Sequence, residues 1–160
     1  MFIKDMTEHQ CITELERVRF GRLACACDNH PYVLPFYFAY SERHLYSFAT
    51  PGRKIEWMRI NPFVCVEVDE VVSSQQWMSV IVFGRYEEMP DTPEWQGRRE
   101  LAHDLLAQRS MWWQPGYAAG THRGVPHALV PIYYRICIDS MTGHRAVPDE
   151  IQAGEVSPNP

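Results

Sequence analysis

A short stretch near residue 50 contains the residues best suited to hold an anion. An apolar run, Leu45–Ala49, stops at a Thr-Pro-Gly corner, and Arg53 and Lys54 follow directly. The Thr50 hydroxyl can cap a helix, and Pro51 suits the first helical position, where a missing N–H costs nothing. The sequence therefore predicts that a strand ends here and a helix begins. The free N–H groups of that helix and the two cations would form a phosphate site. The alternative is a capped surface helix with two solvated cations.

Other kinds of chemistry find little support in the chain. The seven histidines lack ligand spacing, and a metal bound by His122 and His127 would still need a third ligand. Cys25 and Cys27 do not have the spacing of zinc ligands, and we interpret them as small buried side chains on one face of a strand. No nucleophile elbow, glycine-rich dinucleotide motif or P-loop is present. We therefore expect no metal site, and no hydrolytic centre is indicated.

Aromatic side chains accompany the predicted anion site. Each alone is more typical of a core than of a cofactor pocket. Together with a phosphate site they suggest a planar, phosphorylated ligand that brings its own reactivity and requires no catalytic side chain. The aromatic residues considered are Tyr32, Phe36, Phe48, Trp77, Phe83, Trp112 and Trp113.

Size and composition are those of a single soluble domain. The chain has 160 residues, of which 46% are hydrophobic and 22% are charged. A formal net charge of −5 without a basic block argues against nucleic acid as a partner. Five cysteines without a secretion signal argue against a disulfide framework. No apolar run approaches the roughly 18 residues of a membrane span. A cytoplasmic protein with no membrane partner is expected.

The order of predicted elements favours a sheet-rich fold. Six strands are expected at 22–27, 31–40, 45–49, 63–69, 77–86 and 129–138, and three helices at 7–19, 50–60 and 93–108. The segment 110–126 has no assignment, and Thr142-Gly143 is expected to turn the chain out of the last strand. The pattern predicts a mainly β (α+β) domain, a small antiparallel barrel over 1–147 with flanking helices. Residues 148–160 would form a loose C-terminal tail.

Prolines and a glycine inside predicted strands indicate where those strands lie or where they are irregular. Pro31 and Pro35 cannot donate ladder hydrogen bonds, so their strand should lie at an edge, at a bulge or against a ligand. Gly84 inside a long strand suggests a bulge or a close approach of another backbone.

An ordered set of short motifs resembles a known family. Taken together, the motifs look like the pyridoxamine 5′-phosphate oxidase-like flavoproteins, in the branch that includes nitroimidazole-resistance (Nim-type) proteins. The resemblance extends from about Glu8 to Ala146. It rests on Gly21–Ala24, Pro31–Tyr40, Leu45-Tyr46, Gly52–Lys54, Asn61-Pro62, Val68-Asp69, Trp77–Gly84 and Ile138–Gly143.

This resemblance implies a six-stranded split β-barrel that forms a homodimer and binds FMN between the subunits. The isoalloxazine ring would lie against backbone groups of Val33, Leu34, Pro35 and Phe36. The phosphate would be held by Phe48, Ala49, Thr50, Arg53 and Lys54. The partner subunit would contribute Trp77, Ser79 and Val80. Trp112 and Trp113 would cover the flavin or shape a substrate pocket.

The resemblance implies an FMN-dependent oxidoreductase that acts on a small molecule. Relatives commonly have a histidine at or near the position of Phe48, and its absence separates this chain from Nim-type substrate handling. The substrate-binding arginine and histidine of true pyridoxamine 5′-phosphate oxidases have no counterpart that can be placed. One alternative is a non-catalytic sensor or carrier of a flavin, a tetrapyrrole-like or a phosphorylated ligand, and another is a structural dimer without cofactor. A deazaflavin could replace FMN, and the electron donor stays open.

Overall fold

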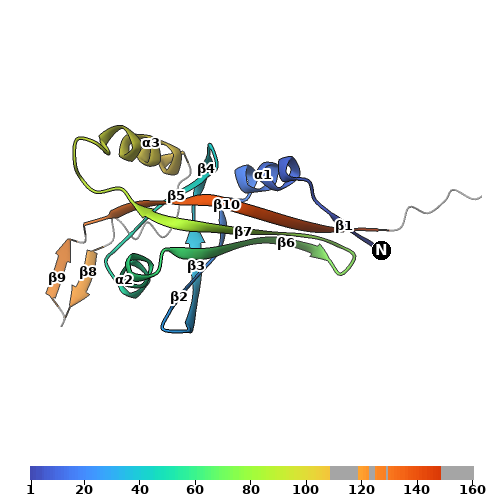
Figure 1. Ribbon diagram of the computed structural model, residues 1–160, viewed down its shortest axis with the longest axis horizontal. Coiled ribbons are helices and arrows are strands. Elements are labelled where there is room, and N and C mark those ends of the chain that lie inside the picture. The colour runs from blue at the N-terminus through green and yellow to red at the C-terminus, as the bar shows by residue number, and fades with distance from the viewer. Residues whose placement is uncertain (109–118, 123–124, 129, 149–160) are drawn as a thin grey trace, which may run out of the picture.

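The computed structural model describes residues 1–108, 119–122, 125–128 and 130–148 (Figure 1). The three helices are α1 (Glu8–Arg17), α2 (Arg53–Ile60) and α3 (Gln96–Ala107). The strands are β1 (Phe2–Asp5), β2 (Phe20–Cys27), β3 (His30–Tyr37), β4 (Ala39–Ser41), β5 (His44–Ala49), β6 (Phe63–Ser73), β7 (Gln76–Glu88), β8 (Ala119–His122), β9 (Val125–Ala128) and β10 (Ile132–Val147).

Eight strands form one antiparallel sheet. Its order is β3-β2-β6-β7-β10-β5-β4, with β1 paired to β10, while β8 and β9 form a separate hairpin. The end strands β3 and β4 are joined through Phe38, yet no ladder connects them among the residues described, so the curved sheet is not closed. The predicted antiparallel split barrel with three helices is confirmed. The strand count of six was too low, because β1, β4, β8 and β9 were not expected.

The last strand runs further than predicted. β10 continues through Thr142-Gly143 to Val147 and pairs there with β7 and β1, so the expected turn was wrong. Gly143 instead allows α1 to approach the sheet closely. A Cβ atom on Gly143 would lie 2.7 Å from the Cys11 Sγ and 3.0 Å from the Met6 Sδ. The glycine therefore makes room for packing and does not bend the strand.

The expectations for α1 and for Gly84 are confirmed. The Thr7 hydroxyl accepts from the Gln10 N–H, and the Gln10 side chain accepts from the Thr7 N–H, which is a complete capping box. A Cβ on Gly84 would lie 2.6 Å from the Cys137 carbonyl oxygen, and the β7–β10 register shifts close by, between Ile138 and Ser140. Close backbone approach thus coincides with a bulge.

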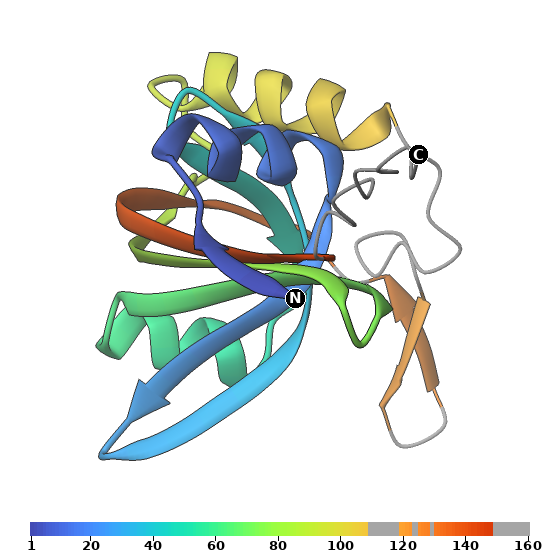
Figure 2. The ribbon, with the colours of Figure 1, turned by 90° about the vertical axis from the view of Figure 1, so that its right-hand side faces the viewer.

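The core has two parts on opposite faces of the sheet. The main cluster fills the barrel with alternate residues of the central strands, including Leu23, Val66, Val80 and Ile136, all fully buried. The smaller cluster lies under α3, where Ala102 and Leu106 pack against strand residues such as Tyr46. Figure 2 shows α3 and α1 on one side of the sheet and α2 on the other. Of the helices described, none is both long and apolar enough to cross a membrane.

Gly21 provides a test of the close packing between β2 and β6. A Cβ at this position would lie 2.2 Å from the Glu67 carbonyl oxygen, so Gly21→Ala forces the two backbones apart. We expect the free energy of unfolding, measured by chemical denaturation, to fall by about 2 kcal/mol. Gly97→Ala is the control, because nothing lies within 4 Å of a Cβ at this position in α3. That variant should be unchanged or more stable by up to about 1 kcal/mol. Equal stability of the two variants would contradict the packing argument.

Candidate functional site

Helix α2 begins two residues later than its sequence pattern predicts. Gly52, not Thr50, occupies the N-cap position, and no side chain caps the helix. The Gly52 carbonyl accepts from the N–H groups of Ile55 and Glu56, so the prediction of a Thr50 hydroxyl cap was wrong. The cations keep their predicted relation to the helix, since Arg53 is its first residue and Lys54 its second. Free N–H groups of the first turn and both cations therefore share one end of α2.

Lys54 has the chemistry of an anion-binding residue. Its side chain is half-buried on the helix that packs against β2, and burial lowers the pKa of its ammonium group, which the nearby Cys25 thiol partly offsets. In the described part of the chain, no carboxylate or carbonyl oxygen forms a hydrogen bond or ion pair with Lys54. A partly desolvated cation without a counter-ion is costly to maintain, and a bound anion would remove that cost.

Arg53 and two aromatic rings connect the start of α2 to β3. The Arg53 guanidinium lies 5.8 Å from the centre of the Tyr32 ring. Tyr32 in turn meets Trp57 of α2 edge-to-face, with 5.6 Å between ring centres. These contacts place β3 beside the two cations, so that one ligand can touch both elements.

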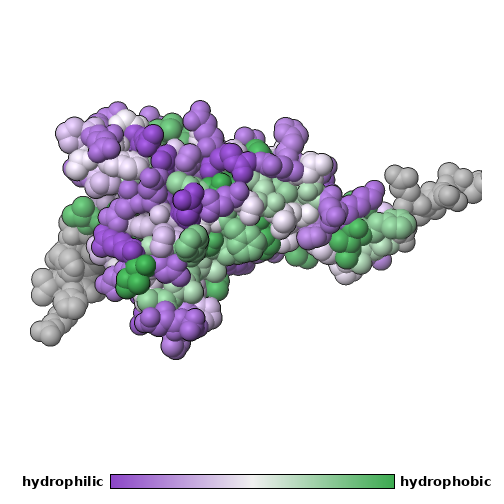
Figure 3. Space-filling view, viewed as in Figure 1, coloured by the Kyte–Doolittle hydropathy of each residue, from purple (hydrophilic) through white to green (hydrophobic). Residues whose placement is uncertain are grey.

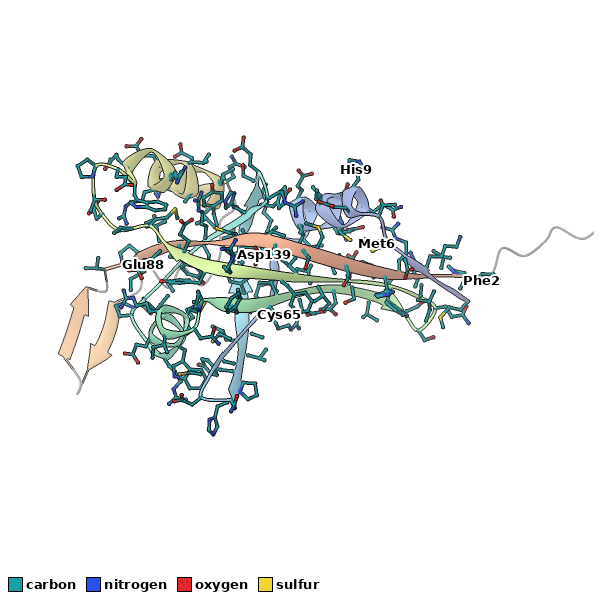
Figure 4. All side chains as sticks on the ribbon, viewed as in Figure 1. Phe2, Met6, His9, Cys65, Glu88 and Asp139 are labelled. Atoms are coloured by element: carbon teal, nitrogen blue, oxygen red, sulfur yellow. The ribbon has the colours of Figure 1, made fainter. Side chains whose placement is uncertain are left out.

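The other end of α2 is fixed to β7 by a charge network that the sequence analysis missed. The Arg59 guanidinium donates two hydrogen bonds to the Glu88 carboxylate, at 2.8 and 2.7 Å, and the Tyr86 hydroxyl donates a third at 2.8 Å. Hydrogen bonds from Arg59 help lower the pKa of Glu88. Figure 4 labels Glu88 where β7 ends beside α2. No local sequence pattern predicts this ion pair, because Arg59 and Glu88 are 29 residues apart.

The four residues predicted to line a ring occupy an edge strand. β3 is the first strand of the sheet order, which confirms the edge position inferred from Pro35. Val33 is 59% exposed, and Pro35 is also exposed. Leu34 is half-buried, while Phe36 is buried in the barrel and stacked on Phe38 at 5.4 Å. A ligand at this edge would meet backbone groups and the exposed side chains, not Phe36.

The end of β5 completes this group of predicted residues. The Ser47 hydroxyl donates to the Tyr37 carbonyl oxygen at 2.7 Å, which ties β5 to the end of β3. Phe48 packs on Tyr133 of β10, with 5.7 Å between ring centres, and Ala49 is buried. Half-buried Thr50 then leads to α2. The structure thus gathers nine of the fourteen predicted residues around β3, β5 and α2.

The remaining predicted residues lie elsewhere. Trp77 and Ser79 are half-buried on the outer face of β7, and Val80 is fully buried in the barrel. Trp77 lines a small hollow of about 170 Å³ near the β6–β7 turn, at the opposite end of the molecule from α2 (Figure 1). A single chain therefore does not bring Trp77 to α2. Trp112 and Trp113 fall outside the described residues.

A second hollow lies beside α3. It has a volume of about 380 Å³ and is lined by polar residues of α3 and by Tyr133. The Tyr133 hydroxyl lies 3.2 Å from His103 Nδ1, and the Arg99 guanidinium lies 5.1 Å from the centre of the Tyr133 ring. Across the described ranges, no cluster of three His, Cys, Asp or Glu side chains could hold a metal ion.

Comparison with known proteins identifies the family. Residues 7–145 match the pyridoxamine 5′-phosphate oxidase family. The chain is 37% identical over 151 residues to an uncharacterized protein of Rhizobium meliloti (strain 1021), covering 94% of this chain and 100% of that one. The crystal structure of an FAD-binding protein from Mesorhizobium loti superposes with a TM-score of 0.77 at 42% identity, covering 91% and 99% of the two chains.

More distant structures share the fold. A candidate 5-nitroimidazole antibiotic resistance protein from Bacteroides thetaiotaomicron has a TM-score of 0.64 at 18% identity, over 91% of this chain and 89% of the other. The family match covers most of the chain and includes every described residue of the group around α2. The chain therefore belongs to the pyridoxamine 5′-phosphate oxidase family.

Proposed function

We propose that the protein binds a flavin whose phosphate is held at the start of α2, and that it uses this flavin as an oxidoreductase acting on a small molecule. The observation that carries the proposal is the half-buried Lys54 ammonium, which has no counter-ion among the described residues and sits beside Arg53 at a helix N-terminus. The FAD-binding function of the Mesorhizobium loti protein, 42% identical, supports the same ligand class.

The residues around α2 fit such a group in complementary ways. Lys54, Arg53 and the first-turn N–H groups neutralise and orient a phosphate. The backbone of β3 lies alongside and offers an edge for a flat ring, and Arg59 with Glu88 fixes the helix that carries both cations. A bound flavin supplies hydride or electron transfer.

The phosphate site alone does not select among flavins, because FMN and FAD share the phosphate next to the ribityl chain. We propose FMN as the ligand, with FAD and a deazaflavin as the alternatives that mass spectrometry of the released ligand would identify. Phe48, at the place where relatives commonly have a histidine, favours a second candidate function, a flavin carrier without turnover. Retained flavin with no reductant–acceptor pair that turns it over would establish the carrier.

We also propose a homodimer with the flavin between the subunits. The outer face of β6 and β7 carries exposed Phe63 and Phe83, at 66% and 52%, and no described helix covers it. Apolar surface is visible in the middle of the molecule in Figure 3. An ion pair between Arg85 and Asp139 adds charge to the same region. A second copy on this face could bring its own Trp77 to α2, which the first copy cannot do.

Lys54 provides the central test. Titration of the flavin-free protein with FMN should quench flavin fluorescence, and Lys54→Ala should weaken FMN affinity at least 10-fold, because a charged hydrogen bond to phosphate is lost. Lys54→Arg should lose less, and riboflavin, which lacks the phosphate, should bind both variants like the unchanged protein. Absence of quenching in the unchanged protein would refute flavin binding. Equal FMN affinity of Lys54→Ala would remove Lys54 from the site.

The same residue predicts a dependence on pH. Burial lowers the pKa of Lys54 in the free protein, and a bound phosphate would raise it again. Above the lowered pKa of Lys54, FMN binding must be accompanied by uptake of a proton. The affinity for FMN should therefore be constant at pH values below this pKa and fall as the pH rises toward the ordinary pKa of lysine. Lys54→Arg stays charged and should show no such fall. A parallel decline in that variant would assign the effect to another group.

The dimer has a separate test. Phe83→Glu places a charge in the proposed interface, and we expect a shift from dimer to monomer in light scattering, together with at least a 10-fold loss of FMN affinity. Leu101→Glu is the control, because Leu101 is 40% exposed on α3, away from this face. A monomeric unchanged protein would refute the dimer, whatever its flavin content.

A further inference from the structure

Two buried tyrosine rings lie in contact inside the barrel. Tyr134 of β10 is fully buried, and the centre of its ring lies 5.3 Å from that of Tyr86 of β7, which is 8% exposed. Tyr134 also stacks on Phe36 of β3, with 6.3 Å between ring centres. The three rings form a continuous aromatic path through the core, from β3 to the end of β7.

The two phenols differ in what their hydroxyl groups contact. The Tyr86 hydroxyl donates to a carboxylate oxygen of Glu88 at 2.8 Å, and Arg59 holds that carboxylate with two further hydrogen bonds. The Tyr134 hydroxyl has no carboxylate partner in the described part of the chain, and its polar neighbour is the Ser47 hydroxyl. Tyr86 therefore has a base within reach of its phenolic proton, and Tyr134 does not.

The protonation states favour a transfer of this proton only after the phenol has lost an electron. Burial raises the pKa of Tyr134, and burial together with the hydrogen bond to Glu88 raises the pKa of Tyr86, so both phenols are neutral at pH 7. Hydrogen bonds from Arg59 lower the pKa of Glu88, which is therefore a carboxylate. A phenol that loses an electron becomes a strong acid, and a carboxylate at hydrogen-bond distance accepts its proton. Of the two rings, Tyr86 can thus be oxidised and stay uncharged.

We propose that Tyr86 is a redox-active residue: when an oxygen-centred radical takes one electron from this pair of rings, the oxidised site settles on Tyr86, which passes its phenolic proton to Glu88. The attacking radical is reduced to its anion, and the protein then holds a neutral Tyr86 phenoxyl radical and a protonated Glu88. A one-electron reductant in solution, such as ascorbate, returns the electron while Glu88 returns the proton.

This role goes beyond the proposed flavin function. A reduced flavin that meets dioxygen would supply oxygen-centred radicals beside β3, whereas the electron transfer from Tyr86 itself needs no flavin. The pair of rings would then protect the barrel from one-electron oxidation, because the radical is held at a site that a solution reductant can repair.

Flash-quench oxidation of the full chain without added FMN tests the assignment. Light excites tris(bipyridine)ruthenium(II), a cobalt(III) ammine oxidises the excited complex, and the resulting ruthenium(III) removes one electron from the protein. A long-lived tyrosyl radical should appear in transient absorption and in the EPR spectrum of rapidly frozen samples. Tyr86→Phe should lose this signal, whereas Tyr134→Phe should keep it. A long-lived signal of equal yield in Tyr86→Phe would overturn the proposal, whether or not the protein binds FMN.

The proton acceptor has its own measurement. Glu88→Gln keeps the shape of the side chain but replaces the base by an amide, so the lifetime of the radical should fall at least 10-fold. In the unchanged protein the radical should form more slowly in heavy water, because the proton moves with the electron. An unchanged lifetime in Glu88→Gln, or equal rates in light and heavy water, would refute proton transfer to Glu88 even if Tyr86→Phe failed to fold.

Tyr40→Phe is the matched control. The Tyr40 hydroxyl on β4 accepts a hydrogen bond from the Arg43 N–H, so its removal takes away a phenol that is not bonded to Glu88. This variant should give the same long-lived signal as the unchanged protein. Circular dichroism and the unfolding midpoint identify the variants that are folded. Loss of the signal in Tyr40→Phe, with Tyr86 intact, would assign the radical to Tyr40 and overturn the proposal.

Discussion

The sheet cannot close because the strands at its two ends, β3 and β4, are joined by a single residue. β3 leads into β4 through Phe38, and strands that follow one another need a loop of about two residues to pair side by side. The barrel therefore remains split at this point. β3 keeps an open edge, and a hydrogen bond from the Ser47 hydroxyl to the Tyr37 carbonyl connects β5 to the end of β3. The position of the proposed ligand follows from this break in the ladder.

Helix α2 adds charge beside the open edge, and the two together form the candidate site. Its buried residues Ile55 and Met58 fix one face in the core, and the bonds between Arg59 and Glu88 hold its far end to β7. Lys54 is left partly desolvated at the other end. The charge at one end of α2 is paired, because Arg59 bonds to Glu88. The positive charge at the other end is uncompensated, so a bound phosphate would be most strongly stabilised there.

Much of the fold follows from local patterns, and each exception has an identifiable physical cause. The capping box at Thr7 and the edge position of Pro35 depend on groups close in sequence, and both were predictable. Gly143 looks like a turn residue next to Thr142, but α1, near the other end of the chain, can pack against the sheet only because Gly143 has no side chain. The Thr50 cap failed because the Gly52 carbonyl receives the first helical bonds instead. A contact distant in sequence decided the case of Gly143, whereas a bond within the first turn of α2 decided that of Thr50.

The candidate site divides in the same way. Arg53 and Lys54 were recognisable from charge at a predicted helix start, whereas the ring-lining residues came from the family resemblance. The Arg59–Glu88 pair had no signal in the sequence.

The prolines of β3 also bear on how the edge of the sheet behaves when no ligand covers it. A fully equipped edge would invite pairing between copies, and such pairing leads to aggregation. Because Pro31 and Pro35 have no N–H, this edge offers fewer donors with which a strand of another copy could pair.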